Sequence, residues 1–245
     1  MSFCHSIDLS LTYPNGTQAL DRVTMHVARG EAVALVGPSG CGKSTLLRII
    51  AGLLQSSHGA VILDDRQVAG PTRATGLMFQ DPALLPWRSV EENIRLPLEL
   101  GRQAGHGSAD VMPLIKLVGL QGFEHALPRE LSGGMAQRTA LARALVTQPE
   151  LLLMDEPFGA LDALTREGLT AQLQTVWRDL GTTVIMVTHS IAEAVFMADR
   201  VLVMSARPGT IVGEVTVGLN RPRAWSTQGS PVFGSAVDAV RALLR

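Results

Sequence analysis

The sequence predicts an α/β fold with a mostly parallel sheet. Two observations support this class: strand-length apolar runs recur along the 245 residues, and segments with helical spacing separate several of them. The runs at 32–36, 151–154, 183–187 and 201–204 are unbroken strings of apolar or β-branched residues. Such strings are typical of strands that are buried on both faces of a parallel sheet.

The first half of the chain begins this alternation. The strand at 32–36 is followed by a glycine-rich loop and by a helix over 45–51, which Gly52 is suited to end. Two more apolar strings, at 61–63 and 77–79, are further strand candidates. Strand and helix therefore follow each other in the order that an open α/β fold requires.

A long helix is expected between the strands at 151–154 and 183–187. Apolar residues recur there at near-helical spacing, and Gly181 is placed to stop the helix. These residues are Leu161, Leu164, Leu169, Leu173, Val176 and Leu180.

The segment at 86–148 follows a different pattern. Helical spacing occurs at 90–100 and 111–118, a polar break falls at 101–108, and no clear alternation is present. We predict that this segment is a mostly helical insertion in the α/β core. The pattern weakens after Val217, so residues 218–245 are expected to form a short C-terminal tail with a short helix over 236–244.

The charge balance excludes some classes of function. Lys and Arg total 21 against 22 Asp and Glu, the formal net charge is −1, and no basic block stands out, so we expect no nucleic-acid partner. Hydrophobic residues make up 46% of the chain, which is enough for a substantial core. No apolar stretch approaches the roughly 18 residues of a membrane span. Residues 1–10 lack a signal-peptide pattern, and Cys4 and Cys41 are expected to be free thiols in a reducing cytoplasm.

The strongest motif lies between the strand at 32–36 and the helix after it. It matches the phosphate-loop pattern, with four residues between two glycines and then Lys-Ser. Its members are Gly37, Pro38, Ser39, Gly40, Cys41, Gly42, Lys43 and Ser44.

Each residue type in this motif suits a phosphate ligand. Glycines let successive N–H groups curl around phosphates without Cβ clashes, and the helix N-terminus points its positive end at the same anions. Lys43 can reach the β- and γ-phosphates, and the Ser44 hydroxyl can bind Mg²⁺. The alternative is a chance glycine turn before a helix, which arises in about one such chain in a hundred at average residue usage. The sequence therefore predicts a nucleotide site.

An acidic pair ends the apolar strand at 151–154. A carboxylate at Asp155 can hold Mg²⁺, directly or through water. The next carboxylate, that of Glu156, can polarise the attacking water. Two acids at a strand end are also common on protein surfaces, but their position downstream of a phosphate loop favours the catalytic interpretation.

A second anion-binding corner precedes the acidic pair. Ser132, Gly133 and Gly134 open a helix with an apolar side, and Ser132 is a suitable N-cap. An ordinary capped helix is one interpretation. A Ser-Gly-Gly helix N-terminus also suits an anion, and one nucleotide has no obvious use for two such corners in one subunit. We therefore expect a site shared between two subunits.

The order of these motifs resembles the ATP-binding cassette (ABC) ATPases. Leu131-Ser132-Gly133-Gly134, lying between the phosphate loop and the acidic pair, is similar to the signature of that family. Four more residues stand where the family has its Q-loop glutamine, the end of its D-loop, its switch histidine and its adenine-stacking aromatic ring: Gln80, Asp162, His189 and Tyr13. The resemblance covers about residues 5–217.

Simpler alternatives exist for the minor elements, and two positions depart from the family pattern. Gln80 can be a polar residue that ends a strand, His189 a structural histidine, and Tyr13 a packing residue beside a turn. Met135 stands where the signature often has Gln, and Gly159 where the D-loop often begins with Ser. Neither departure removes a ligand, so we expect an active site.

The resemblance implies a P-loop NTPase core with a mostly parallel sheet, an antiparallel β subdomain and an inserted helical subdomain at about 86–148, within an ABC ATPase domain at 1–217. It implies ATP and Mg²⁺ as cofactors. The implied catalytic residues are Glu156, His189 and Gln80, and the implied metal ligands are Ser44, Gln80 and Asp155. Beyond the phosphate loop, the implied nucleotide contacts are Tyr13, Thr45, Ser132, Gly133, Gly134 and Asp162.

The resemblance also implies a role as the energising subunit of a transporter. A second copy would complete an ATP sandwich, and a groove near Gln80 would receive a short helix from an integral membrane permease at the cytoplasmic face of the inner membrane. The strings at 80–87 and 204–209 resemble importers of nitrate, sulfonates or taurine, which work indirectly with a solute-binding protein.

Rival interpretations come from other classes of protein. A soluble ABC ATPase of cluster assembly is the main alternative. DNA-repair relatives would carry a long coiled-coil insertion before the signature, and none is visible here. Translation relatives usually carry two cassettes, whereas one is visible here. A metabolic kinase with a phosphate loop would leave the Ser-Gly-Gly corner and His189 unexplained.

Overall fold

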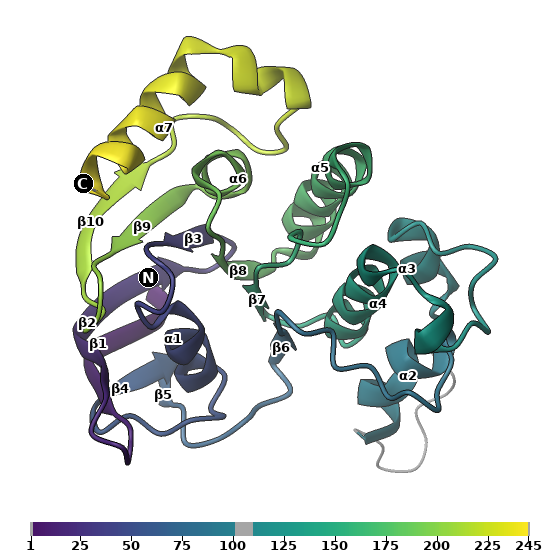
Figure 1. The fold of residues 1–245 in the computed structure, drawn as a ribbon, viewed down its shortest axis with the longest axis horizontal. Helices are drawn as coiled ribbons and strands as arrows, with labels where there is room; N and C mark the ends of the chain where they lie inside the picture. The colour runs from purple at the N-terminus through teal and green to yellow at the C-terminus, as the bar shows by residue number, and fades with distance from the viewer. Residues whose placement is uncertain (1, 101–109, 245) are drawn as a thin grey trace.

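Two β-sheets and the helices around them make up the fold (Figure 1). The computed structural model describes residues 2–100 and 110–244, so the polar break expected at 101–108 lies outside the described residues. A six-stranded sheet has the order β10-β9-β3-β8-β7-β6, and a four-stranded sheet has the order β2-β1-β4-β5. The strands are β1 (Ser2–Thr12), β2 (Gln18–Ala28), β3 (Ala32–Val36), β4 (His58–Leu63), β5 (Arg66–Gln67), β6 (Thr75–Met78), β7 (Leu151–Asp155), β8 (Thr183–Val187), β9 (Arg200–Met204) and β10 (Ile211–Thr216).

The helices connect these strands and cover the larger sheet. They are α1 (Lys43–Ile50), α2 (Val90–Leu100), α3 (Met112–Leu117), α4 (Gly133–Leu145), α5 (Ala163–Leu180), α6 (Ile191–Met197) and α7 (Pro231–Leu243), with 3₁₀ turns η1 (Pro128–Glu130) and η2 (Trp225–Gly229). Within residues 2–100 and 110–244, no helix combines the length and apolar character that a membrane span requires.

The larger sheet is parallel except at one edge. β3 lies between β8 and β9, with Val33 opposite Ile185 on one side and Arg200 on the other. β6, β7 and β8 continue the parallel pairing, and only β10 runs antiparallel, against β9. Every residue of β3, β7 and β8 is buried. The prediction of a mostly parallel sheet with fully buried central strands is confirmed.

The two faces of this sheet pack against different partners. Successive side chains of a strand point to opposite faces, and β3 shows the result directly. Val33 and Leu35 join a core with α1 and the antiparallel sheet, whereas Ala34 joins a larger core that includes residues of α4, α5, α6 and α7. The phosphate-loop motif therefore leaves the sheet from a central strand that is enclosed on both faces.

The segment between β6 and β7 is helical. α2, α3 and α4 form a lobe beside the sheet (Figure 1), and α2 and α4 pack against each other. The helices expected at 90–100 and 111–118 are present at Val90–Leu100 and Met112–Leu117. Side chains from this lobe, such as Ile94 and Ile115, join the same core as the central strands.

Several elements differ from the expectation. β10 is a strand that the sequence analysis does not predict, and its residues alternate between half-buried and exposed. The helix expected over 236–244 begins at Pro231, because Ser230 caps it by accepting a hydrogen bond from the Phe233 amide at 3.3 Å. Phe233 and Val240 of this helix are buried in the larger core. Thus residues after 217 contribute to the packed body of the protein.

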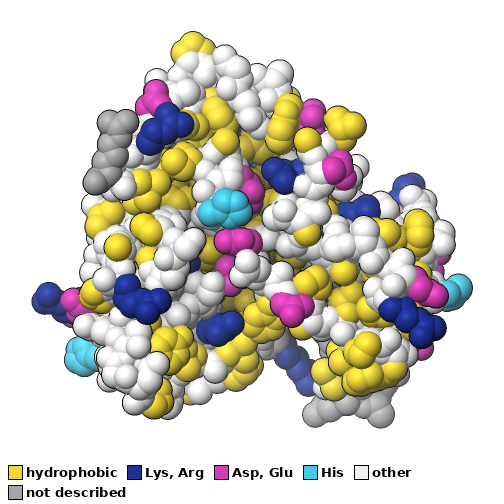
Figure 2. Space-filling view, viewed as in Figure 1, with side chains coloured by type: hydrophobic (Ala, Val, Ile, Leu, Met, Phe, Trp, Pro, Cys, Tyr) yellow, Lys and Arg dark blue, Asp and Glu magenta, His cyan; other side chains and the backbone are white. Residues whose placement is uncertain are grey.

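Charges of both signs are interspersed over the visible face of the molecule (Figure 2). This dispersion matches the formal net charge of −1. Both cysteines are present as buried thiols, and burial raises the pKa of the Cys4 thiol to about 12.

Candidate active site

The phosphate loop connects β3 to α1 and is closely surrounded by other strands. Gly40 and Gly42 have φ values of +74° and +109°, which favour glycine. A Cβ on Gly42 would lie 2.7 Å from Leu20 Cδ2 and 2.8 Å from the Ala19 carbonyl oxygen. A Cβ on Gly37 would lie 2.8 Å from the Met204 carbonyl oxygen. Larger residues would therefore disturb the loop at both ends.

Lys43 lies at the start of α1 and bends back over the loop. Its side chain is largely buried, and its Nζ donates hydrogen bonds to the carbonyl oxygens of Gly37 at 2.8 Å and Pro38 at 2.9 Å. These bonds hold a positive charge beside the backbone amides of the loop. The N-terminus of α1 adds its own partial positive charge at the same place. The arrangement suits a polyphosphate.

Asp155 lies at the carboxyl end of β7, opposite the start of α1. It is 8% exposed, and burial raises the pKa of its carboxyl, while a hydrogen bond with the Ser44 side chain opposes that shift. Among the described residues, no group of three or more His, Cys, Asp or Glu side chains could hold a metal ion. Mg²⁺ usually takes only one or two protein carboxylates, together with phosphate oxygens and water. The Ser44 and Asp155 oxygens therefore fit Mg²⁺ bound together with a nucleotide.

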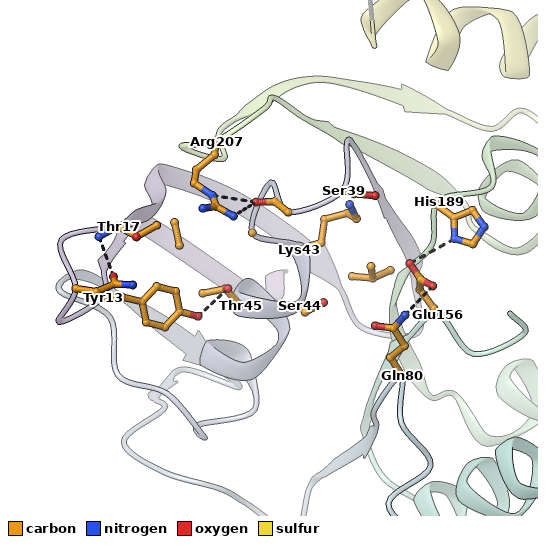
Figure 3. Close-up of a pocket in the computed structure, with 15 residues that line it drawn as sticks. Tyr13, Thr17, Ser39, Lys43, Ser44, Thr45, Gln80, Glu156, His189 and Arg207 are labelled. Atoms are coloured by element: carbon orange, nitrogen blue, oxygen red, sulfur yellow. Dashed lines mark hydrogen bonds and ion pairs between the residues drawn. The ribbon is translucent and has the colours of Figure 1, made fainter.

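Glu156 is contacted by two of the other predicted site residues (Figure 3). Gln80 Nε2 donates to Glu156 Oε2 at 3.2 Å, and His189 Nδ1 lies 3.3 Å from Glu156 Oε1. The backbone of Glu156 has a φ of +49°, in the left-handed region that non-glycine residues rarely adopt. A hydrogen bond from the Glu156 amide to the Val187 carbonyl, at 2.9 Å, helps to hold this conformation. Such strain clusters at functional sites.

One cavity brings most of the predicted residues together. Its volume is about 580 Å³, within the usual range for small-molecule sites. Tyr13 lies at one end (Figure 3), where its hydroxyl is 3.0 Å from Thr45 Oγ1. The predicted residues that line the cavity are Tyr13, Ser39, Gly40, Gly42, Lys43, Ser44, Thr45, Gln80, Glu156 and His189.

The signature residues and Asp162 are not among the residues that line this cavity. Ser132 caps α4, because its Oγ accepts a hydrogen bond from the Met135 amide at 3.2 Å. Asp162 caps α5 by accepting a bond from the Thr165 amide at 3.0 Å, and hydrogen bonds from Thr165 lower the pKa of its carboxyl. Both residues therefore have a local structural role within a single subunit.

Gln137 is a functional candidate that the sequence reading did not single out. It is 4% exposed, its Nε2 donates to the Glu156 carbonyl oxygen at 2.8 Å, and its Oε1 accepts a bond from the Ala160 amide at 3.0 Å. Helical spacing places Gln137 on the same face as the buried Leu141. A polar residue on the apolar face of a helix is the sequence feature that indicates a buried hydrogen-bonding role. Gln137 ties the signature helix to the backbone of the acidic pair.

We expect Gln137→Leu to destabilise the protein by about 1–3 kcal/mol, because it removes two part-buried hydrogen bonds, one to the Glu156 carbonyl and one from the Ala160 amide. The hydrolysis rate should fall as well, since the Glu156 backbone loses a support. Urea denaturation and a phosphate-release assay measure the two effects. Gln172→Leu, at an exposed position of α5, is the control and should change stability by less than about 0.5 kcal/mol. Equal behaviour of the two variants would refute a role for the Gln137 bridge.

Strand, glycine loop, helix and a buried acid at the end of β7, another parallel strand of the same sheet, define a phosphate-loop nucleotide-binding protein. Residues 20–159 match the family described as ABC transporter. The chain belongs to this family: it is an ABC transporter ATP-binding subunit that binds ATP and acts as an ATPase.

Several known proteins are similar to this chain. An uncharacterized ABC transporter ATP-binding protein of Methanocaldococcus jannaschii is 49% identical over 210 residues, covering 85% of this chain and 79% of that protein. The taurine import ATP-binding protein TauB of Rhizobium johnstonii is 44% identical over 245 residues, covering 98% and 94%. A solved ATP-binding cassette, a dimer in a post-hydrolysis state bound to ADP and Pi, is 31% identical with a TM-score of 0.80 and covers 89% of this chain and 100% of its own.

Proposed function

We propose that two copies of this ATPase sandwich ATP and drive a membrane permease that imports a small anion or organic solute such as nitrate, a sulfonate or taurine. One observation carries the proposal: the cavity unites the phosphate loop with Glu156, Gln80 and His189, whereas the Ser-Gly-Gly corner lies outside it. Each subunit thus holds one complete half of a site and the complementary corner for another.

The phosphate side of the site is built from the loop and β7. Lys43, now bonded to two loop carbonyls, can instead donate to the β- and γ-phosphates of ATP. Ser44, Asp155 and the Gln80 side chain oxygen would hold Mg²⁺. Mg²⁺ held there would supply positive charge that offsets the negative charge developing on the phosphates. Tyr13 would stack on adenine.

Glu156 is the proposed general base. Its two carboxylate oxygens contact Gln80 and His189, so its orientation is fixed from two sides before nucleotide arrives. A water beside the γ-phosphate could then give a proton to Glu156 as it attacks. His189 is 67% exposed, so its ring can turn from Glu156 towards the γ-phosphate.

The second half of the site is proposed to come from another copy. The N-terminus of α4, with Ser132, Gly133 and Gly134, would meet the γ-phosphate of ATP bound to the partner, and Asp162 would lie at the same junction. The similar cassette solved as a dimer with ADP and Pi supports this arrangement.

A second cavity supports contact with a permease. It has a volume of about 700 Å³ and lies between β6 and α2. Its apolar lining includes Leu77, Phe79, Leu96, Pro97, Leu98 and Leu100. A short amphipathic helix is the occupant that such a groove fits, and we assign it to an integral membrane permease at the cytoplasmic face of the inner membrane.

This groove is connected to the catalytic residues through the segment after β6. Phe79 and Ala83, on either side of Gln80, both line the groove. Arg143 of α4 also lines it and donates to the Ala83 carbonyl at 2.9 Å. Movement of a helix in the groove would therefore shift Gln80 relative to Glu156.

The import direction and the solute class rest on relatives and on two short strings. Relatives named taurine import ATP-binding protein TauB reach 44% identity over nearly the full chain, and the strings at 80–87 and 204–209 point to the same group of importers. A solute-binding protein outside the membrane would deliver the solute to the permease.

Affinity purification tests this assignment. The tagged chain, extracted in mild detergent from its native host, should retain a permease, with two copies of the chain per complex. Leu100→Arg, in the groove and 78% exposed, should lose the permease because it adds charge to an apolar contact. Leu180→Arg is the matched control, since it also changes an exposed leucine that ends a helix. Retention of the permease by Leu100→Arg would exclude this groove, and its absence from the parent complex would exclude the transport role.

A further inference from the structure

The turn between β9 and β10 lies against the phosphate loop, although 167 positions of sequence separate Arg207 from Gly40. β9 pairs with β3 in register to the end of that strand, so both strands end at the same edge of the sheet. The turn is closed by Ser205 and Thr210, with Ser205 N donating to Thr210 O at 2.9 Å and Thr210 N to Ser205 Oγ at 2.9 Å. The turn therefore has a fixed shape beside the site.

Gly209 allows this turn to approach the loop closely. A Cβ at this position would lie 2.1 Å from the Cys41 carbonyl oxygen. The Gly209 amide donates to the Ala19 carbonyl at 2.9 Å, and its carbonyl accepts from the Asp21 amide at 3.0 Å. The turn is thus tied to β2 as well, and it packs on the phosphate loop without room for a side chain.

Arg207 reaches from this turn to the loop. Its Nε and Nη2 both donate to the Gly40 carbonyl oxygen, at 3.1 Å and 3.0 Å (Figure 3). The side chain is exposed and also lines the nucleotide cavity. Among the residues that the structure describes, no carboxylate pairs with Arg207, so its positive charge at the cavity is not neutralised.

We propose that Arg207 is a nucleotide-positioning residue of this ATPase. By holding the Gly40 carbonyl, it fixes the peptide that joins Gly40 to Cys41, whose N–H points the opposite way because the peptide is trans and planar. The Cys41 amide donates to the Pro38 carbonyl at 3.3 Å, so this peptide of the curled loop is held at both its carbonyl and its amide before ATP arrives. The guanidinium adds attraction for the polyphosphate. The inference rests on the proposed nucleotide site and adds a residue from outside the phosphate loop.

Arg207→Met removes the charge and both hydrogen bonds but keeps a flexible side chain of similar length. We expect the Kd for MgATP, measured by calorimetry, to rise about tenfold, as is typical for loss of hydrogen bonds from a charged group. KM should rise in parallel, and kcat should stay within about twofold of the parent, because only binding is weakened. Hydrogen exchange in the ATP-free protein should become faster in the loop amides and stay unchanged in α5.

Arg207→Lys should recover part of the affinity, since an ammonium can still donate to Gly40 but cannot form the forked contact. Arg241→Met is the control for loss of an exposed arginine, because Arg241 pairs only with Asp238 on α7 in the described structure, and it should bind MgATP like the parent. If Arg207→Met binds MgATP with the parental Kd while Lys43→Ala loses affinity, the inference about Arg207 is wrong and the nucleotide site stands. Parental binding by both variants would overturn the nucleotide site and the inference together, and a fall in kcat without a rise in KM would assign Arg207 to another role.

Discussion

Replacing Glu156 with Gln should lower the ATP hydrolysis rate by at least about 10²-fold while MgATP still binds, as is typical for loss of a general base. The substitution keeps the size of the side chain and one of its two acceptor oxygens, but removes the negative charge and the basicity of the carboxylate. Lys43, Ser44 and Asp155 are unchanged, so binding should persist. Single-turnover phosphate release and calorimetry separate the two effects.

The same variant should accumulate as a dimer when ATP is present. Unhydrolysed ATP would keep the phosphate loop of one copy joined to the Ser132 corner of the other. Adding Ser132→Arg should abolish this dimer, because it introduces bulk and charge at the shared interface. Light scattering coupled to gel filtration measures the mass of all three proteins. A parental hydrolysis rate in Glu156→Gln would reject the catalytic assignment, whereas an inactive variant that stays monomeric with ATP would reject the shared site in the free subunit.

Lys43→Ala should weaken MgATP binding by roughly 10- to 100-fold, since hydrogen bonds to charged groups contribute about 1.5–3 kcal/mol each. The protein should still fold, because the partners that the lysine leaves, the carbonyls of Gly37 and Pro38, belong to a loop at an open cavity. Circular dichroism checks the fold, and calorimetry with MgATP measures affinity.

Lys116 is the natural control for this experiment, because it is the only other lysine in the chain. It is exposed at the end of α3, so Lys116→Ala should bind and hydrolyse MgATP like the parent. Parental affinity in Lys43→Ala would show that the phosphates bind elsewhere.

Much of the sheet could be predicted from local sequence. The strands β3, β7 and β8 are enclosed on both faces. Apolar or β-branched side chains therefore occupy every position except Asp155, and such a run is the sequence signal of a buried strand. The antiparallel sheet gave a weaker signal. β1 and β2 pair through several register shifts, so the period of two is interrupted along both strands, and only family resemblance indicated this sheet.

The sequence predicts most of the chemically active residues of the site, but it does not predict which of them contact one another. A phosphate loop needs its glycines, Lys43 and Ser44 in a fixed order within one short segment. A contiguous sequence motif therefore predicts its function. The acidic pair was similarly marked by its position at the end of an apolar strand. Gln80 and His189 had no such string, and their contacts with Glu156 depend on how β6, β7 and β8 align in the sheet.

The sequence by itself determined the fold class, the nucleotide ligand and the identity of the acidic pair, because each depends on residues that are neighbours along the chain. Only the tertiary structure decided which distant groups support them. Gln137 meets the Glu156 backbone, and Arg207 meets Gly40, although each pair is formed by separate elements. Hydrophobic periodicity indicates which face of a helix or strand is buried. It does not indicate which polar group of the neighbouring element contacts that face.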